Sequence, residues 1–459
     1  MVEEAKVVLN LLLKKGYEAY YIGGKCRNEL HNQFHPEAKV DIKDIDIVTN
    51  ASVDTIKNLF PNSDVRGESF QVVAVNFGGF EFEVATYRRD LYDVKALKGD
   101  KIARPEIVKA TTLDEDRERR DFTINAVAQD IEGNFVDYKY VYRNKKISAI
   151  SDIKNKEIRA IGNPKQRFKE DPVRIIRGFR FMAQLGYTIE KQTFKAIENN
   201  LDLLNKIPHE RIAGEMNKLI LGRYAADTLK LMKAIGVFNI TVNNSLKGTV
   251  STILPGLNEL TDEQFDVLKP LNNTISKSPI TLLEVWTMLL KPLGIEGAKL
   301  NLESIQALNN TDIRKVEWLI EHFTLIDSED IRNDIFAARN GIVKDLKLMG
   351  MRDLIENLCR IHTKYDATKK EKAIRLTNSF RVRPYFEEQL KVNGETMMQI
   401  ANEGPGPWIG VAKEKLLEKL INTDKFPKED EKYMELVQEA IEEALFEQTM
   451  NEIKNKKKG

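Results

Sequence analysis

The stretch KDIDIVT at residues 43–49 places two carboxylates, Asp44 and Asp46, one residue apart in an otherwise apolar run. Successive side chains of a β-strand point to opposite faces, so both aspartates would share one face and Ile45 and Ile47 the other. This alternation is typical of a half-buried strand with a solvated polar face. Two carboxylates on one face are also suitable oxygen ligands for Mg²⁺. The stretch therefore predicts a strand and leaves both interpretations of its aspartates open.

Further strand signals lie on either side of this stretch. YEAYYIGG (17–24) is rich in strand-forming residues and ends in a glycine pair. FQVVAVNFGGFEFEVATY (70–87) predicts two strands joined by a Gly78-Gly79 hairpin turn. Residues 89–112 are polar, charged and without clear period, so we expect a long loop there. The first 150 residues therefore predict a small mixed sheet with helices.

Helical periodicity replaces the strand signal after about residue 150. In EDPVRIIRGFRFMAQLGY (170–187), apolar residues recur at helical spacing and predict a buried stripe. Pro172 suits the first turn of this helix and Gly186 suits its end. Most segments from there onward are also helical, which predicts an α+β head followed by an all-α remainder.

Composition restricts the class of protein. The 459 residues are 42% hydrophobic and 31% charged, as expected of a globular chain long enough for several domains. With 71 basic and 70 acidic residues, any footprint for a nucleic acid must be local. The two cysteines exclude a disulfide framework, and no apolar run is long enough to span a bilayer. The acidic N-terminus does not fit a signal peptide. We expect a cytoplasmic protein with no membrane partner.

A candidate phosphate site precedes the two aspartates. Gly23 and Gly24 end a predicted strand just before a predicted helix, where backbone amides and the helix N-terminus attract a phosphate. Arg27 can clamp the same group. Glu83, on a nearby predicted strand, is either a third carboxylate of the site or an ordinary exposed residue.

Dense arginines lie beside acids in RERRDFTINAVAQD (117–130) and RFKEDPVRIIRGFRF (167–181). Asp171 and Arg174 are three residues apart, and we expect them to be neighbours on one helix face, with Arg177 and Arg180 on its flank. Such a pair is usually a surface ion pair. It also matches the amine and ring nitrogen of cytosine and adenine, and mispairs with guanine and uracil.

Four blocks, in order, resemble one known family. GGKCRNEL (23–30), DIDIVTNAS (44–52) with EFEVATYR (81–88), RRDFTINAVAQDIEGNFVDY (119–138) and IRAIGNPKQRFKEDPVRIIRGFRF (158–181) are similar to motifs of the bacterial-type, class II CCA tRNA nucleotidyltransferases. These enzymes share a superfamily with bacterial poly(A) polymerases. VNGETMMQIANEGPGPWIG (392–410) is similar to a segment of their tail.

The resemblance implies an α+β fold with a nucleotidyltransferase head (1–150), a base-reading neck (151–215), a body (216–330) and a tRNA-binding tail (331–459). It implies template-independent addition of C, C and A from CTP and ATP to tRNA by two-metal nucleotidyl transfer with Mg²⁺, and no obligate protein partner. The implied site residues fall into four groups: Asp44 and Asp46 for the metal; Gly24 and Arg27 for the triphosphate; Arg120, Asp121 and Asn125 for phosphates and ribose; and Asp171, Arg174, Arg177 and Arg180 for the base. To these we add Gly23 beside the triphosphate and Glu83 as a further acid.

Departures and alternatives accompany the resemblance. Cys26 and Asn28 stand where the family usually has Val and Asp, and the missing acid at 28 changes the expected local support of Arg27. The Arg104-Pro105 pair in the predicted loop favours full CCA addition. The basic C-terminal end is short, unlike that of the poly(A) polymerases. Three alternatives stay open: an A-adding tRNA nucleotidyltransferase, a poly(A) polymerase and, in another class, a non-catalytic RNA-binding module.

Overall fold

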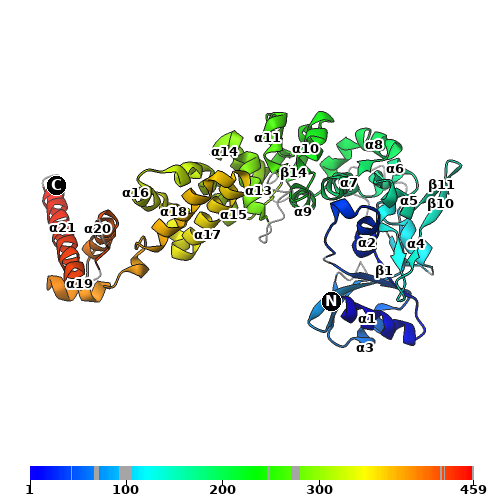
Figure 1. Ribbon diagram of the computed structural model, residues 1–459, viewed down its shortest axis with the longest axis horizontal. Coiled ribbons are helices and arrows are strands. Elements are labelled where there is room, and N and C mark those ends of the chain that lie inside the picture. Colours follow the sequence, from blue (N-terminus) through cyan, green and yellow to red (C-terminus); the bar gives the residue numbers. More distant parts are fainter. Residues whose placement is uncertain are drawn as a thin grey trace. The chain divides into compact units, whose positions relative to one another are not determined.

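The computed structural model describes residues 1–42, 44–66, 72–92, 106–110, 112–244, 249–269, 280–423, 426–427 and 430–456. The chain forms two compact units, coloured in sequence order in Figure 1. The first unit comprises Met1–Asn272 and Leu300–Ala307, and the second comprises Asn273–Lys299 and Leu308–Gly459. The four predicted domains stay a prediction, because this division does not test their functional boundaries.

The first unit is built on a seven-stranded sheet with the order β3-β4-β5-β2-β1-β8-β9. Its strands are β1 Ala19–Ile22, β2 Asp46–Thr49, β3 Ser63–Arg66, β4 Val72–Phe77, β5 Phe80–Thr86, β8 Ala128–Gln129 and β9 Phe135–Val136. Only the β2–β5 pair is parallel within this sheet, so the predicted mixed sheet is confirmed. The β4–β5 hairpin turns at Gly78 and Gly79, whose φ angles of 61° and 81° suit the expected tight turn.

The two faces of the sheet carry different residues. Figure 1 shows helix α1 (Val2–Lys14) and helix α3 (Val53–Leu59) on one side of the strands and α2 (Gly24–Phe34) on the other. Ile45 and Ile47 are buried in the main core with α1. Val48 is buried in a smaller cluster on the opposite face, the face to which Asp46 also belongs.

Two strand predictions need correction. The strand β2 begins at Asp46, so Asp44 and Ile45 precede it rather than lying within it. The predicted loop at 89–112 begins and ends as a hairpin, in which β6 (Arg88–Leu91) pairs with β7 (Glu106–Lys109). Cross-strand pairing orders a polar segment that lacks apolar periodicity. Arg104 and Pro105 lie outside the described residues.

The remaining helices of the first unit follow the sheet in sequence. They are α4 Leu113–Glu118, α5 Ala149–Lys154, α6 Pro164–Glu170, α7 Val173–Leu185, α8 Lys191–Glu198, α9 His209–Ile220, α10 Ala225–Ala234 and α11 Asp262–Asp266. Three small strand pairs accompany them: β10 Lys139–Tyr142 with β11 Lys145–Ser148, β12 Glu157–Ile158 with β13 Thr188–Ile189, and β14 Thr241–Asn244 with β15 Thr249–Thr252. The predicted helical remainder beyond about residue 150 is confirmed, and the short pairs β12–β13 and β14–β15 are additions that the sequence did not predict.

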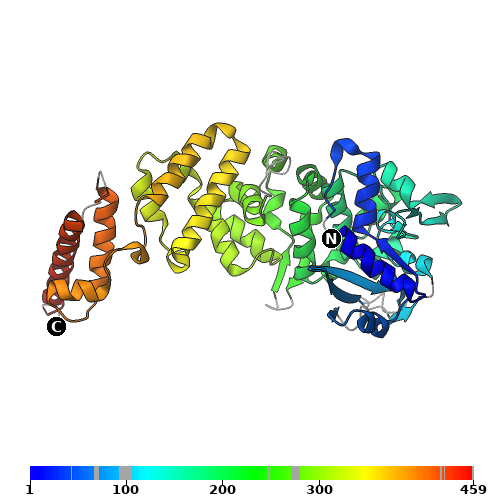
Figure 2. The same cartoon turned by 60° about the horizontal axis from the view of Figure 1, so that its bottom comes forward.

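The second unit is helical in its described residues (Figure 2). Its helices are α13 Leu282–Leu290, α14 Gly294–Ser304, whose last residues belong to the first unit, α15 Asn310–Glu321, α16 Ile331–Ala338, α17 Ile342–Tyr365, α18 Lys370–Arg381, α19 Gly394–Ala401, α20 Trp408–Asn422 and α21 Asp430–Lys456. Among the residues described, no helix combines the length and the apolar character that crossing a bilayer demands.

Candidate active site

Gly23 and Asp46 meet at the end of the central strands. Antiparallel pairing of β1 with β2 sets Ile22 opposite Asp46, so the following Gly23 lies beside the aspartate. Gly23 has a φ of 76°, and a Cβ added to it would lie 3.3 Å from Asp46 Oδ2 and 4.0 Å from an Arg120 terminal nitrogen. A side chain at this position would be strained and would crowd the carboxylate. Glycine therefore keeps the space beside Asp46 open at the N-terminus of α2.

The surroundings of Asp46 disfavour its negative charge. Burial, together with the neighbouring charges of Glu83 and Asp44, raises the pKa of Asp46 to about 6, against the opposing effect of Arg120. A bound divalent cation would relieve this repulsion. The oxygen donors Asp44 and Asp46 fit Mg²⁺, which takes one or two carboxylates and completes its shell with phosphate oxygens and water.

Glu83 is placed less favourably for a metal than the two aspartates. The parallel register sets it beside Asp46, on the same face of the sheet. Its side chain is exposed, however, and Oε1 lies 3.4 Å from the Arg66 guanidinium. No group of three or more His, Cys, Asp or Glu side chains able to hold a metal occurs in the described residues. The role of Glu83 as a further acid of the site stays a prediction.

Arg120 reaches the Gly23–Asp46 corner from the segment after α4. Its guanidinium and that of Arg119 share one fully buried carboxylate, Asp116, at 3.1 and 2.9 Å. Burial alone would raise the pKa of Asp116, but the two arginines lower it below its usual value. Arg120 Nε is buried without a hydrogen-bond partner in the described structure. The arginine is thus anchored at one end and leaves donor capacity beside the carboxylates.

Arg27, Asn125, Asp121 and Arg177 form a continuous chain of hydrogen bonds. Arg27 donates to Asn125 Oδ1 at 2.6 Å, and the Asn125 amide donates to Asp121 Oδ1 at 2.9 Å. Arg177 donates to the other oxygen, Asp121 Oδ2, at 2.7 Å. Despite its burial, the pKa of Asp121 is held well below its usual range, because Arg177 and these hydrogen bonds stabilise the ionised form. The chain links the start of α2 to the middle of α7.

Three arginines surround the buried ring of Phe181. The guanidinium carbons of Arg27, Arg177 and Arg180 lie 5.0, 5.5 and 4.3 Å from the ring centroid. Burial lowers the pKa of Arg27 to about 10, and repulsion by Arg180 contributes. Such a concentration of buried positive charge is costly unless acids or a bound anion compensate for it.

The pairing predicted between Asp171 and Arg174 is wrong. Asp171 ends α6 in an extended conformation, and Arg211 of α9 donates to its Oδ2 at 2.7 Å. Arg174 lies on α7, where it donates to Glu170 at 3.1 Å and to the Arg119 carbonyl at 2.9 Å. Both side chains are therefore held separately, each by a different partner.

Helix α9 supplies two site residues that the sequence reasoning missed. Arg211 holds Asp171, and Glu215 accepts from Arg177 at 3.3 Å and pairs with Arg180 at 2.9 Å. Their spacing of four residues places both on one helix face, which was the available signal. Arg174 and Arg180 are both buried, and Glu170 and Glu215 respectively compensate their charge.

Tyr92, just after β6, is another residue that was missed. Burial raises its pKa to about 12, and its hydroxyl lies within the electrostatic influence of Arg174, Glu170 and Asp171. Its ring therefore belongs to the surroundings of the residues proposed to read the base. Tyr92 lies within the loop predicted at residues 89–112, where the sequence shows no periodic signal.

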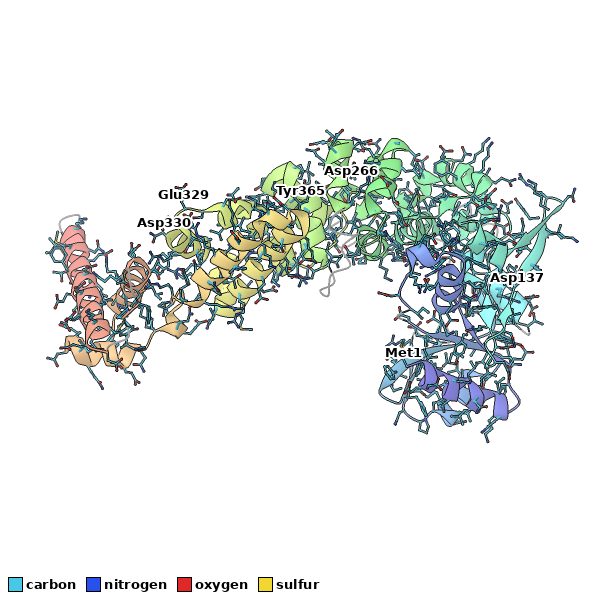
Figure 3. The ribbon with its side chains drawn as sticks, in the orientation of Figure 1. Met1, Asp137, Asp266, Glu329, Asp330 and Tyr365 are labelled. Carbon is cyan, nitrogen blue, oxygen red and sulfur yellow. The ribbon has the colours of Figure 1, made fainter. Side chains whose placement is uncertain are left out.

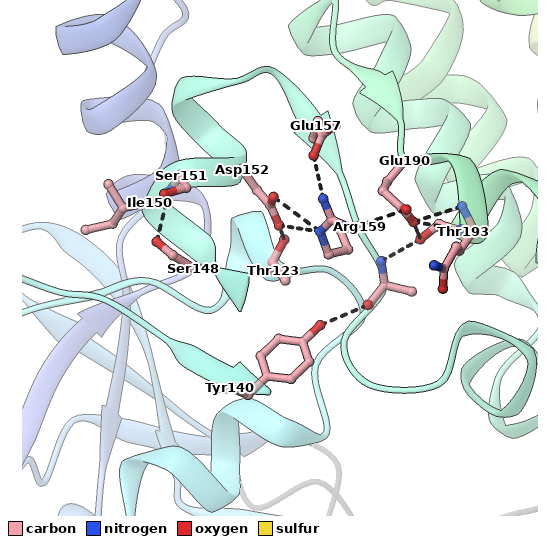
Figure 4. Close-up of polar contacts among 12 residues, drawn as sticks. Thr123, Tyr140, Ser148, Ile150, Ser151, Asp152, Glu157, Arg159, Glu190 and Thr193 are labelled. Atoms are coloured by element: carbon pink, nitrogen blue, oxygen red, sulfur yellow. Dashed lines mark hydrogen bonds and ion pairs between the residues drawn. The ribbon is translucent and has the colours of Figure 1, made fainter. Parts of the chain in front are cut away.

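Asn28 and Arg159 support the site from behind. Arg27 Nε donates to Asn28 Oδ1 at 3.0 Å, so the amide replaces the hydrogen bond, though not the charge, of the usual acid. Arg159 lies among Asp152, Glu157 and Glu190 (Figure 4). The Arg159 carbonyl accepts from the backbone amide of Thr123 at 2.9 Å, and Thr123 lies between Asp121 and Asn125 in the sequence. The loop that carries these two residues is thereby fixed to β12.

Comparison with protein families finds two matches. Residues 19–159 match the family model described as poly A polymerase head domain. Residues 186–242 match the one described as the probable RNA and SrmB-binding site of polymerase A. The first match contains the Gly23–Asp46–Arg120 corner, and the second begins just after α7.

Several similar proteins and solved structures are CCA-adding enzymes. A CCA-adding enzyme of Streptococcus mutans is 32% identical over 352 residues, which cover 75% of this chain and 78% of that protein. One of Bacillus pumilus is 28% identical over 412 residues, 88% of each chain. The Bacillus stearothermophilus CCA-adding enzyme in complex with CTP shares the fold at a TM-score of 0.70 and 23% identity, covering 99% of this chain and 98% of that one. The Thermotoga maritima enzyme complexed with tRNA gives a TM-score of 0.53 at 18% identity, covering 96% and 94%.

Proposed function

This chain belongs to the CCA-adding enzyme family, and we propose that it adds C, C and A, from CTP and ATP, to the 3′ end of tRNA without a nucleic-acid template. Each transfer joins the tRNA 3′ oxygen to the α-phosphorus of the nucleotide and releases pyrophosphate. The observation that carries this proposal is the approach of Gly23, Asp46 and Arg120 to one another beside the arginines around Phe181. A carboxylate that can hold a metal ion thus lies next to buried arginines that can hold a triphosphate.

The arginines and the helix N-terminus take the anionic substrate in this proposal. Gly23 and Gly24 let the triphosphate approach the amides of α2, and Arg27 and Arg120 neutralise its charge. Asp121 and Asn125 orient Arg27 and Arg177 through the chain of hydrogen bonds and line the ribose position. The excess positive charge around Phe181 is compensated when the triphosphate is bound.

Asp171 and Arg174 would select the base. An aspartate accepts from the exocyclic amine of cytosine or adenine, and an arginine donates to the adjacent ring nitrogen. Guanine and uracil present a carbonyl and an N–H at these positions, so both would leave buried groups unpaired. Separate supports, Arg211 for Asp171 and Glu170 for Arg174, favour this role because a rigid pair discriminates better than a mobile one.

The reaction needs a divalent cation, for which we propose Mg²⁺ held by Asp44 and Asp46. When bound, the cation would activate the 3′ hydroxyl and neutralise the leaving pyrophosphate. The donor set supports this choice, because two carboxylates suit a hard cation whose other ligands are phosphate oxygens. We also propose a cytoplasmic location, where tRNA and nucleoside triphosphates are available.

Incorporation assays with two tRNAs test the proposal. One tRNA ends before the CCA sequence and the other ends in CC, and each is incubated with one labelled nucleoside triphosphate at a time. We expect CMP on the first tRNA, a single AMP on the second, and neither GMP nor UMP on either. AMP on the second alone would indicate an A-adding enzyme, and long AMP runs a poly(A) polymerase. Binding of tRNA without any incorporation would indicate the RNA-binding module.

A further inference from the structure

The β10–β11 hairpin is an exposed basic feature that the proposed chemistry does not use. It forms its own two-stranded sheet, separate from the seven-stranded one, and projects from the edge of the first unit (Figures 1 and 3). Residues 139–148 contain four cations and no acid, in a chain whose net charge is only +1. A concentrated local charge in a nearly neutral chain is a footprint for a polyanion.

The base of the hairpin is rigidly attached. The Tyr140 hydroxyl donates to the Ala160 carbonyl at 3.4 Å (Figure 4), and its ring stacks on Tyr138. Ser148 donates to Asp137 at 2.7 Å and caps α5 by accepting from Ser151 at 3.1 Å. Asp137 is marked in Figure 3. The hairpin is therefore a fixed projection rather than a loose loop.

The hairpin connects structurally to the candidate active site. Ala160, which accepts from Tyr140, immediately precedes Ile161, whose amide donates to the Asp121 carbonyl at 3.2 Å. One short segment thus joins the base of the hairpin to the residue that orients the arginines. A polymer held by the hairpin is held by the same rigid unit that performs the transfer.

The charged side chains of the hairpin are largely unpaired. The Lys139 side chain is 74% exposed and its nitrogen lies 3.9 Å from Asp137, a weak contact. Lys145 and Lys146 are exposed and form no ion pair with any residue in the described ranges. Val141, which pairs with Lys146 and shares a face with Lys139, is 67% exposed, whereas Lys145 pairs with Tyr142 on the other face of the ribbon. Packing of the head does not require these cations, so a partner outside the chain explains them better.

We propose that the β10–β11 hairpin binds the phosphate backbone of the tRNA substrate. Lysines on a ribbon act as point charges, which suits sequence-independent contacts with phosphates and not the reading of bases. Such contacts position the RNA and make affinity depend on salt. This inference rests on the proposed function, because it takes tRNA as the polyanion.

The test replaces Lys139, Lys145 and Lys146 together by glutamine. These positions avoid the turn, where Arg143 and Asn144 have positive φ, so the hairpin should still form. We expect KM for tRNA to rise about tenfold, and the slope of log KM against log salt concentration to fall by about two. The kcat and the KM for CTP should stay within about twofold of wild type.

A matched control replaces Lys6 and Lys14 of α1 and Lys15 directly after it by glutamine, which removes the same charge from exposed positions of the same unit. We expect no change in KM for tRNA there. Lys145→Arg with Lys146→Arg should retain binding, since charge rather than shape carries the contact. Thermal unfolding of every variant should match that of wild type.

Three results are distinguishable. If the wild type adds nothing to tRNA, the proposed function fails. If the wild type is active and the hairpin variant keeps its tRNA KM and salt slope, the inference is overturned and the function stands. If the hairpin variant loses binding to phosphatidylglycerol vesicles that the wild type shows, and its KM for tRNA is unchanged, the inference is also overturned, and the hairpin would bind a membrane surface instead.

Discussion

At the scale of single residues, Asp46 shows how function opposes stability. Burial and the nearby acids raise its pKa from 3.8 to about 6, so ionisation destabilises the folded protein when no cation is bound. The unfolded chain keeps the ordinary value. The cost is therefore absent below about pH 4, grows between about pH 4 and pH 6, and is constant above that.

Asp46→Asn should remove this cost and abolish activity. In EDTA at pH 7.5, we expect the variant to be more stable than wild type by about 1–2 kcal/mol, a gain that disappears toward pH 4. Incorporation of CMP and AMP should fall by about a thousandfold or more. Thermal unfolding at several pH values and incorporation assays measure the two effects.

Asp44→Asn is the matched comparison. Asp44 is exposed, so its amide variant should lose activity without any gain in stability. Full turnover in either variant would contradict the proposal that this aspartate is a metal ligand. A loss of stability in Asp46→Asn would contradict the assigned electrostatics.

Asp171 and Arg174 carry the prediction on base selection. Asp171→Ala should admit GTP or UTP at least tenfold more readily relative to CTP, because the acceptor for the exocyclic amine is lost. Arg211→Ala should change selection in the same direction but less, since it releases Asp171 without deleting it. Glu210→Ala, an exposed neighbour on α9, serves as control. Unchanged exclusion of GTP and UTP in Asp171→Ala would refute the base-reading role.

At the scale of elements, most of the head followed from local patterns. The Gly78-Gly79 turn and the alternation in β4 and β5 were readable, because hairpin register depends on near neighbours. The prediction placed Asp171 on a helix, but the following Pro172 keeps it out of one. A residue before proline avoids the helical region, so α6 ends at Glu170 and Asp171 has a φ of −146° and a ψ of 98°. The spacing of Arg211 and Glu215 indicates a shared face of α9, but their contacts with the site depend on tertiary packing, which local patterns do not show.

Helix α9 acts on the site through Glu215. Glu215→Gln keeps the shape but removes the charge that holds Arg177 and Arg180. We expect KM for CTP and ATP to rise about 5–30-fold with a smaller change in kcat, because the arginines become less ordered. Steady-state kinetics measure this split, and Glu215→Asp should partly restore the KM.

Glu210→Gln on the same helix is exposed and should behave as wild type. A Glu215→Gln variant that loses stability but keeps both KM values would show a purely structural role. Equal loss of kcat and kcat/KM would instead point to an interaction made only in the transition state.

At the scale of the whole molecule, the chain returns to the first unit after leaving it. Leu300–Ala307 belongs to the first unit although residues on both sides belong to the second. His209 and Asn217 of α9 hydrogen-bond the carbonyls of Ser304 and Ala307 at 2.8 and 2.7 Å. The sequence reads only as continuous helix here, because bonds across about 90 residues leave no periodic trace. This segment therefore supports the helix that orders the site arginines.

Leu302→Ala tests that support. Leu302 is fully buried, and its truncation should cost about 2–5 kcal/mol, whereas Leu300 is 59% exposed and Leu300→Ala should cost less than about 0.5 kcal/mol. Hydrogen exchange should speed up in α9 of the Leu302→Ala variant, and remain unchanged in α20 and α21. KM for CTP should rise in parallel, since α9 holds Arg177 and Arg180 through Glu215. Faster exchange in α20 and α21 instead would assign the segment to the second unit, and an unchanged KM would separate α9 from nucleotide binding.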